Sequence, residues 1–329
     1  MIIRNVILIM LVWLFVFSGG CASRNSQEGS LKKSDIKKLM VLQKNQIVSK
    51  DKEEKALKKL PPMTVPEYER LGDQYLRQGD INRAFFQYDK ALQLDKNQVG
   101  IRYKVGMIFL QRRLIDEAIR EFEEIVKIDE KYALAYEGMG QAFMQEKRYE
   151  DAERFFLQAL RLNPDLWKSH NFLGLIYNNC SNFDKAIAEY QSAIALKPDQ
   201  GLLFNNLGLS HYFKGEYEKA VKAFMEALKI EASNGKVYNN LAMALCKLGR
   251  YDEAFDAFKK GSDEAQAYNN LGCFYLWEGK SDAAITAFNK AIGIKPSFYN
   301  KASENLKKAQ TSKQNKPLPD FKNNPSPLD

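Results

Sequence analysis

The chain has 329 residues, of which 45% are hydrophobic and 27% charged, as in a soluble folded protein with a large core or an array of repeats. Its net charge of +8 is concentrated in residues 31–60, where ten lysines against four acidic residues contribute +6. The remainder is nearly neutral. This distribution excludes the basic face that a nucleic-acid-binding protein would need, so we expect no nucleic-acid partner.

The N-terminus reads MIIRNVILIMLVWLFVFSGGCAS, with Arg4, an apolar run over residues 6–17 and then Cys21. The run is too short for a typical membrane span and suits the core of a signal peptide. Small residues followed by a cysteine resemble the lipobox of bacterial lipoproteins. The resemblance implies a signal peptide at 1–20 and lipidation of Cys21. Because Ala22 follows rather than Asp, it also implies an outer-membrane lipoprotein that faces the periplasm. An uncleaved membrane anchor is the alternative.

Residues 21–64 form a polar, lysine-rich segment that ends shortly after two prolines, and we interpret it as a tether close to the membrane. Nothing in its sequence specifies a core. A run of charge of this kind is usually solvated. Attraction to anionic phospholipid beside the anchor is the second interpretation.

From residue 65 onward the sequence repeats, and the clearest marker is an alanine that recurs every 34 residues, with a last interval of 30. The alanines are residues 84, 118, 152, 186, 220, 254 and 284. An aromatic residue follows each alanine by four positions, and a glycine, or once an alanine, precedes it by twelve. This pattern identifies the array as a member of the tetratricopeptide repeat (TPR) family. The resemblance implies an all-α solenoid, a right-handed superhelix of helix-turn-helix repeats.

Seven repeats, a capping helix and a tail follow from this spacing. The predicted repeats are 65–98, 99–132, 133–166, 167–200, 201–234, a short repeat 235–264, and 265–298. Residues 299–310 carry apolar residues at helical spacing and predict a helix that caps the array. Residues 311–329 are rich in proline and predict a disordered tail. In the short repeat, we expect the second helix to end early at Gly261 and the angle to the next repeat to change.

The array offers no constellation for catalysis. His170 and His211 occupy repeat positions that are otherwise aromatic, which indicates packing roles. No cysteine pair has metal-ligand spacing and no glycine-rich loop follows a strand, so we expect no metal, no cofactor, no small-molecule substrate and no enzymatic activity. An enzyme hidden in the solenoid is the alternative from another class. The three cysteines after Cys21 are expected to be free, with a Cys246–Cys273 disulfide as the less favoured possibility.

The first helix of each repeat is expected to line the concave side of the array. In the first three repeats this side is mixed and charged, with Glu69, Arg70, Asp73, Lys104, Glu137, Gln141 and Gln145. In the last three it is rich in amides and partly aromatic. Amides pair with peptide backbone and aromatic rings supply affinity, so we predict a site for an extended peptide. Its residues are Asn205, Asn206, Phe213, Asn239, Asn240, Asn269, Asn270 and Trp277.

Within this site, Asn206, Asn240 and Asn270 occur once per repeat and form a predicted ladder. Some TPR proteins use an asparagine at this position to hold a peptide, and the resemblance supports the idea. The alternative is that these amides satisfy local groups and that the array is only a scaffold.

The C-terminal third resembles the TPR lipoproteins of tight-adherence (Flp/Tad) pilus assembly systems. The resemblance lies in the shortened repeat that runs into AQAYNNLG, one full repeat, and a terminal helix with the sequence ASENL. It implies a pilotin-like lipoprotein that supports assembly of a pilus secretion complex through protein contacts. The alternatives are a type IV pilus biogenesis lipoprotein and a general envelope scaffold that docks peptidoglycan enzymes.

Overall fold

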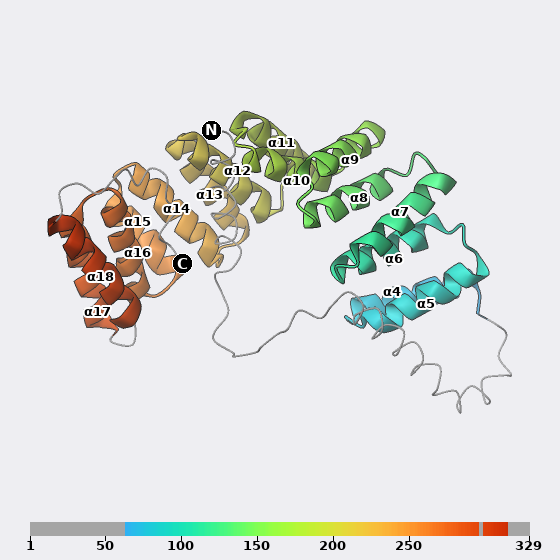
Figure 1. The fold of residues 1–329 in the computed structure, drawn as a ribbon, viewed down its shortest axis with the longest axis horizontal. Helices are drawn as coiled ribbons and strands as arrows, with labels where there is room; N and C mark the ends of the chain where they lie inside the picture. Colours follow the sequence, from blue (N-terminus) through green and yellow to red (C-terminus); the bar gives the residue numbers. More distant parts are fainter. Residues whose placement is uncertain (1–62, 296–298, 315–329) are drawn as a thin grey trace, which may run out of the picture. The chain divides into compact units, whose positions relative to one another are not determined.

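The computed structural model describes residues 63–295 and 299–314, and this part of the chain consists of fifteen helices joined by short turns, with no strand (Figure 1). The predicted signal peptide, nearly all of the predicted tether and residues 315–329 lie outside it. The helices are α4 (Val65–Arg77), α5 (Ile81–Leu94), α6 (Val99–Gln111), α7 (Ile115–Ile128), α8 (Ala133–Gln145), α9 (Tyr149–Leu162), α10 (Trp167–Asn179), α11 (Phe183–Leu196), α12 (Gly201–Lys214), α13 (Tyr217–Ile230), α14 (Gly235–Lys247), α15 (Tyr251–Gly261), α16 (Glu264–Trp277), α17 (Ser281–Ile294) and α18 (Tyr299–Gln314).

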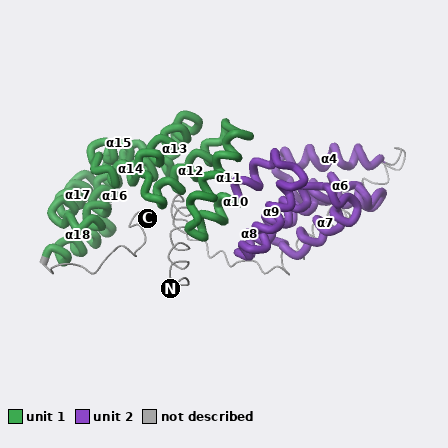
Figure 2. Tube along the Cα trace, turned by 90° about the horizontal axis from the view of Figure 1, so that it is seen from above, with its two compact units in different colours: residues 1–23, 173–329 green, residues 24–172 purple. Residues whose placement is uncertain are grey.

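The helices form an all-α solenoid in two compact units that divide within α10 (Figure 2). Residues 63–172 belong to the N-terminal unit, and the described residues from 173 onward belong to the C-terminal unit. In the first, α4 to α9 pack one against the next in chain order, and in the second α11 to α18 do the same. Each hydrophobic face is therefore covered by the neighbouring helix along the chain, as a stack of repeats requires.

A buried aromatic ring from the second helix of each repeat lies against a small residue of the first helix. Phe122 of α7 is 0% exposed. A Cβ atom added to Gly106 of α6 would lie 2.6 Å from this ring, and one added to Gly138 of α8 would lie 2.5 Å from it. The structure shows that the space beside the glycines is filled by a ring, which joins two repeats.

The turn between the two helices of a repeat contains one residue in the left-handed backbone region. Four of these residues are glycines, which adopt positive φ without a steric penalty. The other three are Arg113, Lys147 and Ser181, with φ of 56°, 60° and 58°. The chain thus keeps one turn geometry along the array even where the residue disfavours it.

Within each unit, some first helices of successive repeats contact one another. α6 contacts α8 in the N-terminal unit, α12 contacts α14 in the C-terminal unit, and α16 contacts the capping helix α18. Among the described helices, second helices of successive repeats make no comparable contact. The first helices therefore form the more closely spaced side, which we call the inner face.

The prediction of a shortened helix in the sixth repeat is confirmed, since α15 has 11 residues whereas the other second helices have 14. It ends at Gly261, and the Asp263 side chain accepts a hydrogen bond from the Gln266 backbone N–H at 2.8 Å to cap α16. Gly235 at the start of α14 lies against Gly261, since an added Cβ on Gly235 would lie 2.6 Å from the Gly261 carbonyl oxygen. The backbones of α14 and α15 therefore meet at this point. The altered angle between the sixth and the seventh repeat stays a prediction.

The last helix, α18, packs on α17 and buries Ala302 and Ala309 completely. It continues to Gln314, so the predicted end at residue 310 is wrong, and residues 311–314 of the predicted disordered tail are helical. The Thr311 hydroxyl donates to the Lys307 carbonyl at 2.9 Å. No helix-breaking residue occurs before Pro317, which explains why the helix runs on.

Candidate peptide-binding face

The predicted peptide-binding asparagines lie on the inner face of the C-terminal unit, as adjacent pairs on α12, α14 and α16. Their burial differs. Asn206, Asn269 and Asn270 are 8%, 1% and 4% exposed. Asn205, Asn239 and Asn240 are partly exposed. The predicted ladder of one accessible amide per repeat is therefore reduced to Asn240, with Asn206 and Asn270 enclosed.

Several of these amides bond to the neighbouring repeat. The Asn240 side chain donates from Nδ2 to Asn205 Oδ1 at 2.9 Å, and Asn305 of α18 donates to Asn269 Oδ1 at 3.1 Å. In both pairs the donor belongs to the later helix and the acceptor to the earlier one. A buried amide needs such a partner to offset its desolvation. These asparagines therefore contribute to cohesion between repeats, the role the sequence left open as the alternative.

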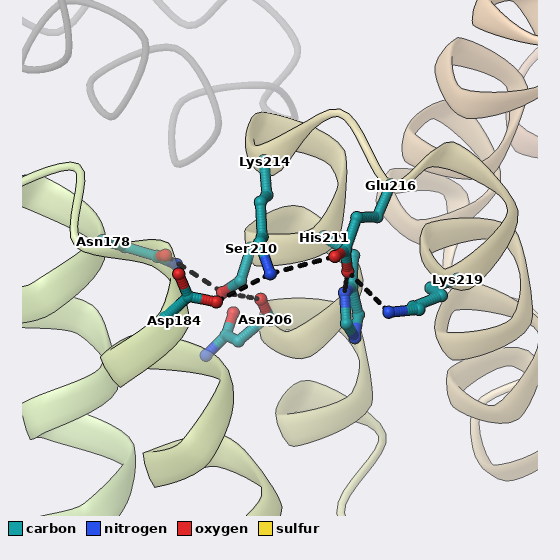
Figure 3. Close-up of polar contacts among 8 residues, drawn as sticks. All are labelled: Asn178, Asp184, Asn206, Ser210, His211, Lys214, Glu216 and Lys219. Atoms are coloured by element: carbon teal, nitrogen blue, oxygen red, sulfur yellow. Dashed lines mark hydrogen bonds and ion pairs between the residues drawn. The ribbon is translucent and has the colours of Figure 1, made fainter.

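Two residues that the sequence did not single out extend the same pattern. The Ser210 hydroxyl of α12 donates to Asn178 Oδ1 at 3.0 Å and contacts the Asn206 carbonyl oxygen at 3.0 Å (Figure 3). Ser169 donates to Glu137 Oε2 at 2.8 Å in the other unit. Both pairs join residues 32 positions apart. This recurrence of an interval slightly shorter than the repeat is the signal in the sequence that could have found them.

The two predicted aromatic anchors differ in accessibility. Phe213 is 41% exposed and stacks on Phe183 with 6.2 Å between ring centroids. Trp277 is only partly exposed, and the Lys247 ammonium lies 3.3 Å from its ring centroid, a cation–π contact that covers one face. Lys247 also pairs with Glu278 at 2.9 Å. Phe213 is thus the more accessible anchor of the two.

The inner face of the N-terminal unit is charged, as predicted, and Lys104 is paired with two of its carboxylates. Lys104 Nζ lies 2.8 Å from Glu69 Oε1 and 2.6 Å from Asp73 Oδ1. The Tyr88 hydroxyl also donates to Asp73 at 2.6 Å. Burial raises the pKa of Glu137, which is 2% exposed, while its bond from Ser169 opposes that shift. Lys104, Glu69 and Asp73 are therefore paired with one another within the unit.

Both histidines contact groups of their own chain. His170 Nε2 lies 3.2 Å from the Pro164 carbonyl oxygen, an arrangement in which Nε2–H donates. His211 is 8% exposed, and its Nδ1 lies 2.7 Å from Glu216 Oε2 (Figure 3). Lys214 and Lys219 also pair with Glu216, at 2.9 and 3.1 Å. Hydrogen bonds from Lys214, Lys219 and His211 lower the pKa of Glu216 to about 2.

Burial lowers the pKa of His211 below its ordinary value of 6.5, and the bond to Glu216 only partly opposes this. Because the unfolded chain then binds this proton more readily, stability is present above pH 6.5 and declines as the pH falls from 6.5 through the folded pKa. We expect His211→Phe to flatten the dependence of stability on pH between about 7 and about 5.5, where carboxylates with ordinary pKa values titrate little. Urea unfolding across this range measures it. If the free energy of unfolding of His211→Phe changed with pH as steeply as that of the wild type, His211 would not be the source of this pH dependence.

The described residues contain no group of three or more His, Cys, Asp or Glu side chains placed to hold a metal ion. Cys180, Cys246 and Cys273 are free thiols, so the Cys246–Cys273 disulfide is absent. Burial raises the pKa of the Cys246 thiol to about 12. Within residues 63–295 and 299–314, no helix is long and apolar enough to cross a membrane.

Comparison with known structures gives three similar proteins. Cut9–Hcn1 of an APC/C hetero-tetramer is 26% identical, with a TM-score of 0.54 over 74% of this chain and 48% of that chain. A tetratricopeptide repeat protein from Parabacteroides merdae is 17% identical, with a TM-score of 0.50 over 75% of this chain and 98% of that one. MamA is 31% identical, with a TM-score of 0.43 over 50% of this chain and 97% of that one.

No curated protein sequence matches the chain. Family models described as TPR repeat or tetratricopeptide repeat do match it along most of the array. The matched residues are 69–133, 133–166, 174–215, 205–264 and 265–298. Together with the stacked helix pairs, these matches establish that the chain belongs to the tetratricopeptide repeat family.

Proposed function

We propose that this TPR protein is a lipid-anchored adaptor of the bacterial envelope. TPR arrays mediate interactions between proteins through the surface that their stacked helices form. Anchoring is proposed from the apolar run and Cys21, and Ala22 after the cysteine supports a location at the outer membrane facing the periplasm. The shortened sixth repeat and the ASENL helix support a pilotin-like role in assembly of a pilus or secretion complex.

The inner face of the C-terminal unit is the surface proposed to hold an extended segment of the partner. The observation that carries this is Phe213, a large ring left 41% exposed on α12, the helix that also carries the partly exposed Asn205. Large aromatic residues at such positions tend to dominate binding energy. Asn205, Asn239 and Asn240 would then pair with the backbone of the segment, and Trp277 would contribute the exposed part of its ring. The enclosed Asn206, Asn269 and Asn270 would hold the helices in place.

Phe213→Ala is expected to reduce capture of the envelope partner by roughly tenfold or more, because it removes the accessible ring. Met225→Ala is the matched control, since Met225 is 50% exposed on α13, a second helix. A photo-crosslinking residue placed at 213 or at 225 in the producing cells, followed by isolation of the membrane fraction, identifies what lies against each position. Equal crosslinking at both positions, or equal capture by both alanine variants, would sink the proposed site.

A further inference from the structure

A carboxyl group is buried between the third and the fourth repeat without an opposite charge beside it. Glu137 of α8 is 2% exposed. Its Oε2 accepts a hydrogen bond from the Ser169 hydroxyl of α10 at 2.8 Å, and its Oε1 accepts one from Gln141 of α8 at 3.5 Å. Both donors are neutral, and Glu137 forms no ion pair among the described residues. A buried carboxylate without an ion-pair partner is costly, whereas the protonated acid is not.

Other repeats carry a paired or a neutral group at the position of Glu137. In the first repeat this residue is Glu69, which is partly exposed and lies 2.8 Å from Lys104. In the fourth and the seventh repeat it is Asn171 and Asn269, which are 6% and 1% exposed. A protonated carboxyl group combines a donor with an acceptor, as an amide does. Glu137 therefore suits this buried position when it holds its proton.

Among the described residues, the ionisable groups that interact with Glu137 belong to α10 and α6. Burial raises the pKa of Glu137 above its ordinary value of 4.5, and the bond from Ser169 and the charge of Lys168 oppose this only partly. Burial, and then a negative charge on Glu137, raise the pKa of Tyr103, so this hydroxyl stays neutral while Glu137 titrates. Among the described groups, α7 and α9 also pack on α8 but supply no charge that acts on Glu137.

We propose that Glu137 forms a pH-sensitive contact, which holds the start of α10 on α8 when the carboxyl group is protonated and loosens it when the group ionises. Ser169 lies in the first turn of α10, and the N-terminal unit ends at residue 172 within the same helix. Because the folded chain binds this proton more readily than the unfolded chain, the stability of the contact is present below pH 4.5 and is lost as the pH rises from 4.5 through the folded pKa. The direction is opposite to that of His211.

Hydrogen exchange of the α8 and α10 amides in the full chain, measured as a function of pH, tests this contact. Glu137→Gln keeps an acceptor for Ser169 but cannot ionise. Comparison of the two chains at the same pH cancels the chemical exchange rates. We expect protection in the wild type to fall relative to Glu137→Gln by up to about tenfold per pH unit above pH 4.5, until Glu137 is ionised in the folded chain. Glu130→Gln, at an exposed position before α8, should follow the wild type.

Ser169→Ala is a second variant, which decides the matter if Glu137→Gln fails to fold. A hydrogen bond to a carboxylate is stronger than one to a neutral acid, so this variant should lower protection more at about pH 8 than at about pH 5. A constant ratio of protection between the wild type and Glu137→Gln across this range would overturn the proposal. So would an equal effect of Ser169→Ala at both pH values, or a loss of the pH dependence in Glu130→Gln.

Discussion

Phe122→Ala is expected to lower the free energy of unfolding by about 3–5 kcal/mol, the cost of removing a fully buried aromatic side chain. The ring is 0% exposed and lies between Gly106 of its own repeat and Gly138 of the next. Neither glycine has a side chain that could fill the cavity. The loss therefore affects the packing within one repeat and between two, and urea unfolding followed by circular dichroism measures it.

The control for this prediction is Leu94→Ala, because Leu94 is 59% exposed. Substitutions at such positions usually change stability by less than about 0.5 kcal/mol. If both variants lost the same stability, the glycine-bounded ring would not be the main contact between these repeats. If Phe122→Ala shifted only part of the urea unfolding curve to lower urea concentration, the array would unfold in segments rather than as one unit.

Cys21→Ser is expected to abolish incorporation of labelled palmitate, because the cysteine thiol is the proposed site of acylation and serine is not a substrate for it. Labelling bacteria that produce the full chain, followed by immunoprecipitation, measures the change. Cys180→Ser is the matched control, since Cys180 is an exposed free thiol in the described part of the array.

A lipid anchor and an uncleaved apolar anchor give different results in this experiment. A lipidated chain loses all label in Cys21→Ser and keeps it in Cys180→Ser. An uncleaved apolar anchor carries no label in either variant and remains in the membrane fraction. Label retained in Cys21→Ser would refute lipidation at this residue and, with it, the proposed sorting to the outer membrane.

The repeat, its helices and the shortened α15 could be predicted because each depends on spacing along one chain segment. The alanine interval and the ring four positions later are visible in the sequence, and Gly261 with Asp263 marks the end of one helix and the start of the next. These are local signals. Local propensity and the apolar period agree here, which is what makes a fold predictable.

The hydrogen-bond partners of the asparagine side chains could not be predicted in the same way. Asn205, Asn239 and Asn269 occupy the same position in three Tyr/Phe-Asn-Asn-Leu segments, yet Asn205 accepts from Asn240, Asn269 accepts from Asn305, and Asn239 Oδ1 has no partner. Each bond joins an amide to a residue on another helix, about one repeat away, so the Tyr/Phe-Asn-Asn-Leu segment itself does not reveal which amide has a partner.

The bonds between first helices also bear on how the chain acquires its structure. The side-chain hydrogen bonds of Ser169, Ser210, Asn240 and Asn305 to earlier helices join residues 32 to 36 positions apart, about one repeat. Chains whose contacts are this local in sequence pay a small loop-closure cost and fold quickly. Each helix packs mainly against its immediate neighbours along the chain. A chain that emerges gradually, from a ribosome or through a translocation channel, can therefore build its array progressively, without waiting for its other end.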